Sequence, residues 1–230
     1  MKAAVLHELG KPPRFEDFPE PSAGNEEAIV QVRAASLKAV DKQLAAGTHF
    51  ASPRELPVIC GTDGIGNLPD GTRVFFGGPR RPYGAMAQRT VAPTAFCFPV
   101  LDPLDDATAA ALANPGVSAL LSLRQRAKLA KGEKVLILGA TGVTGKLAVQ
   151  IAKQLGAARV IAAGHNPEAL QKLRELGADS TMQLNQPEAD LRKAFSQEAG
   201  EAGFNVVIDY VWADPPRFCS PPSRARNLRS

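Results

Sequence analysis

Three glycines stand at equal spacing in the segment "VLILGATGVTGKLAVQIAKQLGA", which begins at Val135. Glycines at this spacing, between an apolar strand and a helix, permit a tight turn, close approach of a pyrophosphate, and close packing of the helix on the strand. The free N–H groups at the helix start would face the anion, and the helix dipole would attract it. The turn therefore predicts a dinucleotide site contacted by Gly139, Ala140, Thr141, Gly142, Val143, Thr144 and Gly145.

Two other interpretations of this turn are weaker. A phosphate-binding loop of the NTPase type needs glycine at position 140 and serine or threonine at position 147, but the chain has Ala140 and Leu147 there. The second alternative is a helix start with incidental glycines. It is disfavoured because three glycines cost a helix stability unless the backbone requires them.

The end of the next strand indicates which dinucleotide binds. An NAD site usually has an acidic residue here, which holds the ribose 2′-hydroxyl and repels a 2′-phosphate. The chain reads "AAGHNPEALQK", so Gly164, His165 and Asn166 occupy this place, and the last two can donate hydrogen bonds to a phosphate. The segment predicts NADP(H); the alternative for His165 is a solvated loop histidine.

Alternating strands and helices position these residues. The apolar run from Val135 to Leu138 predicts a strand buried on both faces, followed by a helix over residues 142–155. Further strands are expected at 159–164, 180–184 and 204–210, with helices at 167–176 and 187–200. Alternation of this kind predicts an α/β fold with a parallel sheet and crossover helices.

The first hundred residues follow a different pattern. Short alternating or apolar stretches, separated by glycine and proline, predict an antiparallel, barrel-like domain of strands and turns. Residues 102–132 then become helical, with a predicted break at Asn114-Pro115-Gly116 and a stop at Lys131-Gly132.

Composition excludes several classes of protein. No apolar run reaches the length of a membrane span, and the first residues lack a signal-like apolar core, so a cytoplasmic protein without membrane contact is expected. The three cysteines are not spaced as metal ligands, which fits reduced thiols.

Of the net charge of +4, residues 213–230 carry +3, from four Arg and one Asp. A nucleic-acid partner is therefore not expected, although binding through this basic tail is the alternative.

Several segments, in order, resemble the medium-chain dehydrogenase/reductase superfamily, in its zinc-independent, quinone oxidoreductase-like branch. They are the opening 47 residues, then "PVICGTDGIG", "GAMAQRTVAP", "AALANPGVSALLSL" and the glycine turn. The resemblance implies a GroES-like β-barrel catalytic domain over residues 1–115 and a Rossmann NADP-binding domain over 116–212. It also implies hydride transfer from NADPH to a small-molecule substrate, a quinone or an enone. A non-catalytic NADPH-binding or sensor protein is the alternative.

The chain departs from zinc-dependent relatives. Thr62 stands where such relatives have a histidine ligand, and Cys60 alone cannot hold Zn²⁺, which requires three or four ligands. No metal is therefore expected.

The resemblance also suggests three catalytic residues at the substrate site and one further residue that contacts the cofactor. Lys38 stands where relatives often have asparagine, and its ammonium could polarise a carbonyl oxygen; the alternative is a solvated surface lysine. Asp41 is expected to orient the loop that contains Lys38, and His49 is expected to line the entrance of the substrate site. Ser118 stands where relatives place a threonine near the nicotinamide.

The end of the chain is irregular. Of the six parallel strands that the resemblance implies, in the order 3-2-1-4-5-6, the sequence supplies four, so an incomplete Rossmann sheet with an open edge is predicted. Relatives commonly form homodimers through the missing edge, which makes a dimer doubtful here. Four prolines in residues 213–230 predict an unstructured tail. A frameshift near Trp212 is one hypothesis, with a truncated and inactive product; a native short form with a basic tail is the other.

Overall fold

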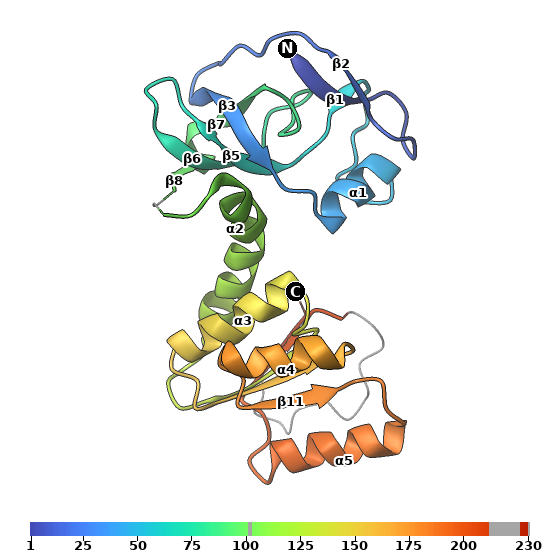
Figure 1. Ribbon diagram of the computed structural model, residues 1–230, viewed down its shortest axis with the longest axis vertical. Coiled ribbons are helices and arrows are strands. Elements are labelled where there is room, and N and C mark those ends of the chain that lie inside the picture. The colour runs from blue at the N-terminus through green and yellow to red at the C-terminus, as the bar shows by residue number, and fades with distance from the viewer. Residues whose placement is uncertain (101–102, 212–225, 230) are drawn as a thin grey trace. The chain divides into compact units, whose positions relative to one another are not determined.

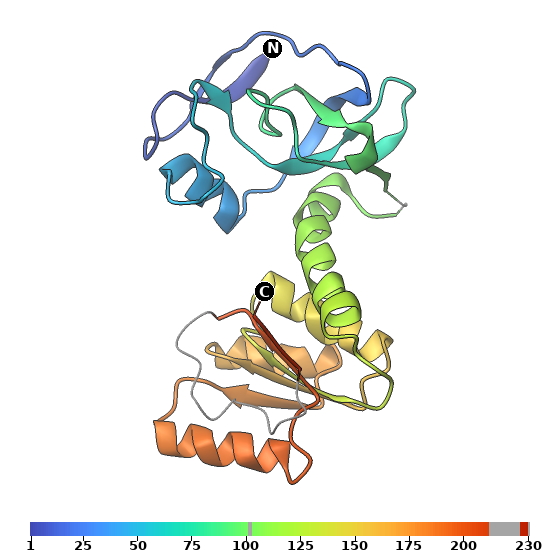
Figure 2. The same cartoon turned by 180° about the vertical axis from the view of Figure 1, so that it is seen from behind.

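The computed structural model describes residues 1–100, 103–211 and 226–229, the last four by their backbone only. The chain divides into two compact units, Met1–Asn114 and Pro115–Ser230. Figure 1 labels those elements of both for which there is room, and Figure 2 shows the same units from behind. Each unit is described by itself.

The first unit contains two antiparallel sheets, as its strand-and-turn pattern predicts. One sheet has the order β2-β1-β4 and the other the order β7-β3-β5-β6-β8. Glycine permits close strand contact at Gly66, where a Cβ atom would lie 2.5 Å from the Gln31 carbonyl oxygen. The strands are β1 (Lys2–Leu6), β2 (Arg14–Asp17), β3 (Glu27–Ala35), β4 (Val58–Ile59), β5 (Asp63–Asn67), β6 (Arg73–Gly77), β7 (Arg89–Pro93) and β8 (Cys97–Pro99).

Two short helices interrupt these strands. Helix α1 (Ala39–Ala46) follows β3, and its first turn is stabilised because the Asp41 carboxylate accepts a hydrogen bond from the Lys38 main-chain N–H at 2.8 Å. The helix ends at Gly47, whose φ of 76° is a left-handed conformation that glycine adopts without strain. A single 3₁₀ turn, η1 (Thr94–Phe96), separates β7 from β8.

The predicted helix break at Asn114-Pro115-Gly116 is wrong. Helix α2 runs without interruption over Asp106–Leu121, and a π-helical turn, η2 (Ser122–Arg126), extends it. Proline removes one main-chain hydrogen bond from a helix interior, but here burial of Ala109, Ala110 and Ala119 on either side stabilises the helical path. The helical segment also ends before the predicted stop at Lys131-Gly132.

The second unit is an α/β layer structure. Its sheet has the order β11-β10-β9-β12-β13, all pairs parallel, so the first four strands have the predicted order 3-2-1-4. The strands are β9 (Lys134–Leu138), β10 (Arg159–Gly164), β11 (Ser180–Gln183), β12 (Val206–Asp209) and β13 (Arg226–Arg229), and the helices are α3 (Val143–Gln154), α4 (Pro167–Glu175) and α5 (Glu188–Ala199).

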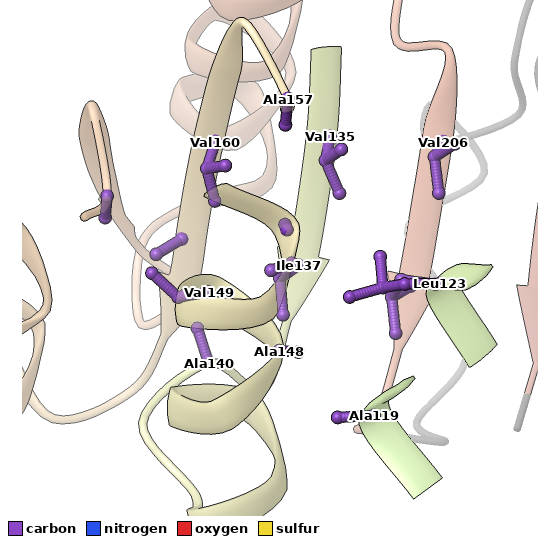
Figure 3. Close-up of a cluster of buried hydrophobic side chains, with 14 of the residues drawn as sticks. Ala119, Leu123, Val135, Ile137, Ala140, Ala148, Val149, Ala157, Val160 and Val206 are labelled. Carbon is purple, nitrogen blue, oxygen red and sulfur yellow. The ribbon is translucent and has the colours of Figure 1, made fainter. Parts of the chain in front are cut away.

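Helices cover both faces of this sheet. On one face, α3, α4 and η2 pack on alternate strand residues such as Val135 and Val160, and Figure 3 shows Val149 and Leu123 directed into the same cluster. On the other face, Phe195 of α5 packs on Leu136 and Ile161. Burial on both faces explains why these strands read as continuous apolar runs rather than alternating ones.

The prediction for the tail is wrong at residues 226–229. These form β13, which pairs with β12 from Val206↔Arg226 to Asp209↔Arg229, so β12 is not the open edge of the sheet. The proline argument does not reach this segment, because Pro222 is the last proline and a ladder strand needs only the N–H groups of its own residues. The predicted disorder of the remaining tail and the frameshift concern residues outside the described ranges.

Candidate functional site

The glycine turn follows β9 as predicted. Gly139 has a φ of 78°, which lets the chain reverse directly after the buried strand. The Ala140 N–H donates to the Ala163 carbonyl oxygen at 2.9 Å, so this amide closes the turn and is not free for a ligand. A contact between Ala140 and the dinucleotide stays a prediction, and it would have to use another group of this residue than the N–H.

The start of α3 offers main-chain donors. Gly142 is the N-cap residue, and no side chain caps this helix. The N–H groups of Val143, Thr144 and Gly145 lie in the first turn, where no intrahelical acceptor exists; the first intrahelical bond is donated by Lys146 to the Gly142 carbonyl oxygen at 2.9 Å. Three amides without intrahelical acceptors and the positive end of a helix dipole are groups that can attract an anion.

The glycines of the turn have different roles. A Cβ atom on Gly145 would lie 2.4 Å from the Gly139 carbonyl oxygen, so helix and strand pack too closely for any side chain. A Cβ atom on Gly142 would lie 3.6 Å from the Gly139 carbonyl oxygen, which is ordinary van der Waals contact, so a side chain fits there. The turn is therefore too tightly packed for a side chain at Gly145 but not at Gly142.

Thr141 contacts the second strand. A Cβ atom on Gly164 would lie 2.6 Å from the Thr141 methyl group, so Gly164 is the residue that allows this side chain to lie against the end of β10. Gly164 is itself buried. The two predicted residues are thus adjacent, with Thr141 packed on the strand end.

A shallow hollow of about 430 Å³ follows β10 and is lined by His165, Asn166, Pro167 and Glu168. Asn166 is the N-cap of α4, and its side-chain oxygen accepts from the Ala169 N–H at 3.0 Å, so its amide group retains its N–H donors. The sequence prediction missed Glu168, whose carboxylate lies in the same hollow as His165. Its place in the first turn of α4 was the available signal.

Ser118 lies in the last turns of α2 and is half-buried. It belongs to the same unit as the glycine turn.

In the first unit, Lys38 is not the solvated surface lysine that was the alternative to a catalytic one. Its side chain is 14% exposed, and its ammonium group donates to the Asp63 carboxylate at 2.8 Å. It also lies 3.3 Å from the Asp41 carboxylate and bonds the hydroxyl and carbonyl oxygens of Ser36 at 3.1 Å each. All of its donors therefore have protein partners.

Asp41 and Asp63 complete this buried network. Asp41 accepts from the main-chain N–H of Thr62 at 3.1 Å and from its hydroxyl at 3.0 Å, which ties the α1 loop to the start of β5. Asp63 also accepts from the Asn114 amide at 3.3 Å. Sequence reasoning expected Asp41 to orient the loop but did not include Asp63. The sequence feature that could have identified Asp63 was its position at the start of an apolar strand, where a buried charge requires a partner.

A cavity of about 330 Å³ lies beside this network, within the first unit. Asp41 and His49 line it, whereas Lys38 does not. Most of the wall is apolar, with contributions from Leu6 and Ile59. Further polar lining side chains, which the sequence prediction did not include in the site, are Cys60, Thr62, Arg81 and Tyr83.

Cys60 is a thiol rather than a thiolate in this cavity. Burial, and secondarily the negative charge of Asp41, raises the pKa of Cys60 above its ordinary value. Because the thiolate is the reactive form of cysteine, Cys60 is not set up as a nucleophile.

Two further properties bear on function. No three His, Cys, Asp or Glu side chains come together as a set of metal ligands within residues 1–100 and 103–211. None of the helices in the described part of the chain has the length and apolar character that a membrane span requires.

Comparison with known families and proteins gives a consistent result. A family described as "Zinc-binding dehydrogenase" matches residues 143–216. A quinone oxidoreductase-like protein 2 homolog of Nematostella vectensis is 28% identical over an alignment of 229 positions, and the match covers 95% of this chain and 61% of that protein. A quinone oxidoreductase of Rattus norvegicus is 27% identical, over 92% of this chain and 66% of that protein. The chain thus spans about three fifths of the length of the first curated relatives it matches.

Solved structures agree with this. The quinone oxidoreductase of Thermus thermophilus, which was also determined in complex with NADPH, matches with a TM-score of 0.80 and 31% identity. The match covers 93% of this chain and 68% of that protein.

Proposed function

The chain belongs to the medium-chain dehydrogenase/reductase superfamily, in its quinone oxidoreductase-like branch, and from this premise we propose that it is an NADPH-dependent reductase. Its substrate is a quinone, an enone or a related activated carbonyl compound. The observation that carries the proposal is the uncapped start of α3, where three main-chain N–H groups and the space in front of Gly142 suit a pyrophosphate.

NADP(H) rather than NAD(H) is supported by the residues at the end of β10. Gly164 and His165 stand where an NAD site usually has a carboxylate, and His165 and the Asn166 amide can donate to a 2′-phosphate. The complex of the Thermus relative with NADPH agrees with this choice. Glu168 also lines the hollow after β10, and its negative charge would weaken the binding of a phosphate there. Substitution of Glu168 measures the size of this effect.

The first unit supplies the substrate side in this proposal, as a GroES-like barrel. An isolated bridge pairs Ala3 with Ala87, and the Ala4 N–H donates to the Met86 carbonyl oxygen at 2.8 Å. These contacts join β1 of the smaller sheet to the segment that leads into β7 of the larger one, which supports a continuous barrel wall. The mainly apolar cavity beside Asp41 is of the size that binds small molecules.

The residues of this chain have binding and orienting roles in the reaction. When bound, NADPH supplies the hydride, which reduces the acceptor together with one proton from water. The amides of Val143, Thr144 and Gly145 bind the pyrophosphate, and the apolar cavity wall limits water around the acceptor. Asp41 and Asp63 hold Thr62 at the cavity, and Lys38 balances their charge, so Lys38 is a positioning residue. The zinc-binding description of the matched family has no counterpart in a ligand set among the described residues, so no step involves zinc.

Titration of the purified chain with NADPH, followed by the fluorescence of the bound cofactor, tests the proposal. Gly142→Val places a side chain in the pyrophosphate space and is expected to weaken binding by roughly 100-fold, the equivalent of about 2.7 kcal/mol. Gln154→Val, which introduces the same side chain at an exposed position at the other end of α3, is the control. Equal affinity of the Gly142→Val variant and the wild type would refute the site.

Turnover is measured separately, as NADPH oxidation with a quinone or an enone as acceptor. Oxidation that depends on the acceptor supports the reductase. Tight NADPH binding without oxidation of any acceptor would instead favour a cofactor-binding or sensor role.

A further inference from the structure

The cavity of the first unit contains two groups that the network around Lys38 does not use. Of its polar lining side chains, Asp41 and Thr62 are bonded to each other, and the Tyr83 hydroxyl donates to the Glu20 carbonyl oxygen at 3.1 Å. His49 and Arg81 are different, because each retains hydrogen-bond donors that no contact recorded within the described residues uses.

One residue, Ala51, positions both groups. Its N–H donates to Nδ1 of His49 at 3.1 Å, so the proton of the neutral imidazole is on Nε2, which is then a donor. Its carbonyl oxygen accepts from a terminal nitrogen of Arg81 at 2.5 Å. The Phe50 ring, 4.3 Å from the His49 ring, further restricts the imidazole. The two side chains are therefore fixed against the same peptide segment.

Arg81 differs in this respect from the arginine beside it. Arg80 pairs with the Glu27 carboxylate at 2.7 Å and with the Ser22 carbonyl oxygen, and it does not line the cavity. Arg81 forms no ion pair within the described residues and keeps four of its five donors after the bond to Ala51. A guanidinium with free donors at the wall of an apolar cavity is suited to bind a carboxylate.

Charge also sets the direction of binding. Arg81 is exposed and also lines the adjoining hollow around Phe50, so it lies at the rim of the cavity. Asp41 is 5% exposed and forms the floor, and the Lys38 ammonium contacts the carboxylates of both Asp41 and Asp63, which leaves one net negative charge that disfavours an anion there. An anionic group would therefore lie at the rim and an uncharged, reducible group at the floor, beside Thr62.

We propose that the natural substrate carries a carboxylate, which Arg81 and His49 bind at the rim of the cavity, in addition to the conjugated carbonyl group that is reduced. The reduction of this substrate rests on the proposed reductase function, whereas the binding of its carboxylate by Arg81 and His49 does not. In the reaction, the hydride adds to the β-carbon of the conjugated system, a proton adds to the α-carbon, and the carboxylate is unchanged.

A matched pair of compounds tests this proposal: 6-oxohept-4-enoate and its methyl ester, in which two methylene groups separate the carboxylate or ester from the double bond that is reduced, so that the change has little effect on the reactivity of the double bond. The wild-type kcat/KM is expected to be roughly 10- to 100-fold higher for the acid, the range that a charge-assisted hydrogen bond gives. Arg81→Met should remove this ratio, and Arg81→Lys should retain part of it. Arg80→Met is the control and should leave the ratio at the wild-type value.

Binding without chemistry separates this proposal from the reductase function. Ligand-observed NMR with 6-oxoheptanoate and its methyl ester needs neither cofactor nor turnover, and the circular dichroism spectrum of each variant reports folding. Acid binding that depends on Arg81, without turnover of any compound, would support the anion site and refute the reductase. An equal kcat/KM for acid and ester, or acid binding unchanged by Arg81→Met, would refute the anion site.

Discussion

The candidate sites of the two units consist of different kinds of chemical groups. In Pro115–Ser230 the site is main chain: three amides at the start of α3, with glycines that keep side chains away. In Met1–Asn114 it is side chain: a lysine buried between two carboxylates beside an apolar cavity. A main-chain site depends on local turn geometry, whereas a buried charge network depends on elements brought together from distant parts of the sequence. The two should therefore respond differently to substitution.

The largest effect is expected at Lys38. Lys38→Met leaves Asp41 and Asp63 buried without their cation, which should destabilise the first unit by about 3–5 kcal/mol. Hydrogen–deuterium exchange of peptides from β5 and β9 measures the two units separately, and only the β5 peptides should lose protection. Lys38→Arg keeps the charge and should retain most of the stability.

A double variant sharpens the same comparison. Lys38→Met with Asp63→Asn removes one buried charge of each sign and should recover part of the stability that Lys38→Met loses. Equal loss of protection in β5 and β9 peptides for the single variant would contradict the separation of the two units.

The next effect is expected in the glycine turn. Gly145→Ala forces a Cβ atom to within 2.4 Å of the Gly139 carbonyl oxygen, so the second unit should lose about 1–3 kcal/mol. Gly142→Ala adds a Cβ atom in ordinary van der Waals contact, 3.6 Å from the Gly139 carbonyl oxygen, and should change stability by less than about 1 kcal/mol, the difference between glycine and alanine at an N-cap. Exchange of β9 and β10 peptides measures both. A Gly145→Ala variant as stable as Gly142→Ala would refute the close packing at this turn.

A smaller effect is expected at Glu168. Glu168→Gln removes a negative charge beside the expected position of the 2′-phosphate, which in a solvated site is worth about 1 kcal/mol. The affinity for NADPH relative to NADH should therefore rise roughly fivefold. Glu175→Gln, at the other end of α4, is the control and should leave this ratio unchanged. A ratio unaffected by Glu168→Gln would place the phosphate elsewhere.

The smallest effect concerns alkaline pH. Tyr210 follows β12, and burial raises its pKa to about 12. A hydrogen bond from Ser122 would lower this pKa, but the Tyr210 hydroxyl has no partner that meets hydrogen-bond geometry. Burial is therefore the dominant cause of the shift. A raised folded pKa stabilises the fold below pH 10, the ordinary value, and this stabilisation declines as pH rises from 10 towards 12. Tyr210→Phe should remove that part of the alkaline loss. Denaturant unfolding at pH 9 and about pH 11 measures the difference.

The difference between the units also explains what could be predicted. In the second unit, the order of β11, β10, β9 and β12 and the position of the glycine turn follow from local patterns, because apolar runs, caps and glycine spacing lie close together in sequence. The exceptions are instructive. Local patterns did not indicate that the Ala140 N–H would pair with Ala163, or that β13 would form in a segment that composition described as irregular. In each case a partner distant in sequence decides the outcome.

In the first unit the antiparallel strands were predictable, but most of the site was not. Lys38 carried no local sign that its ammonium would be buried, because its partner Asp63 is 25 residues away. Arg81 was missed for the same reason: its contact with Ala51 spans 30 residues.

The sequence by itself determined the family, the α/β alternation of the second unit, the order of its first four strands, and the turn at Gly139–Gly145. These depend on φ preferences and on the periodicity of apolar residues, which act over a few neighbouring positions. Only the tertiary structure decided that Lys38 is a buried counterion, that β13 covers β12, and that Arg81 lies at the rim of a cavity with free donors. The energy of a charge or a strand edge depends on which distant groups surround it, and only the folded chain specifies those groups.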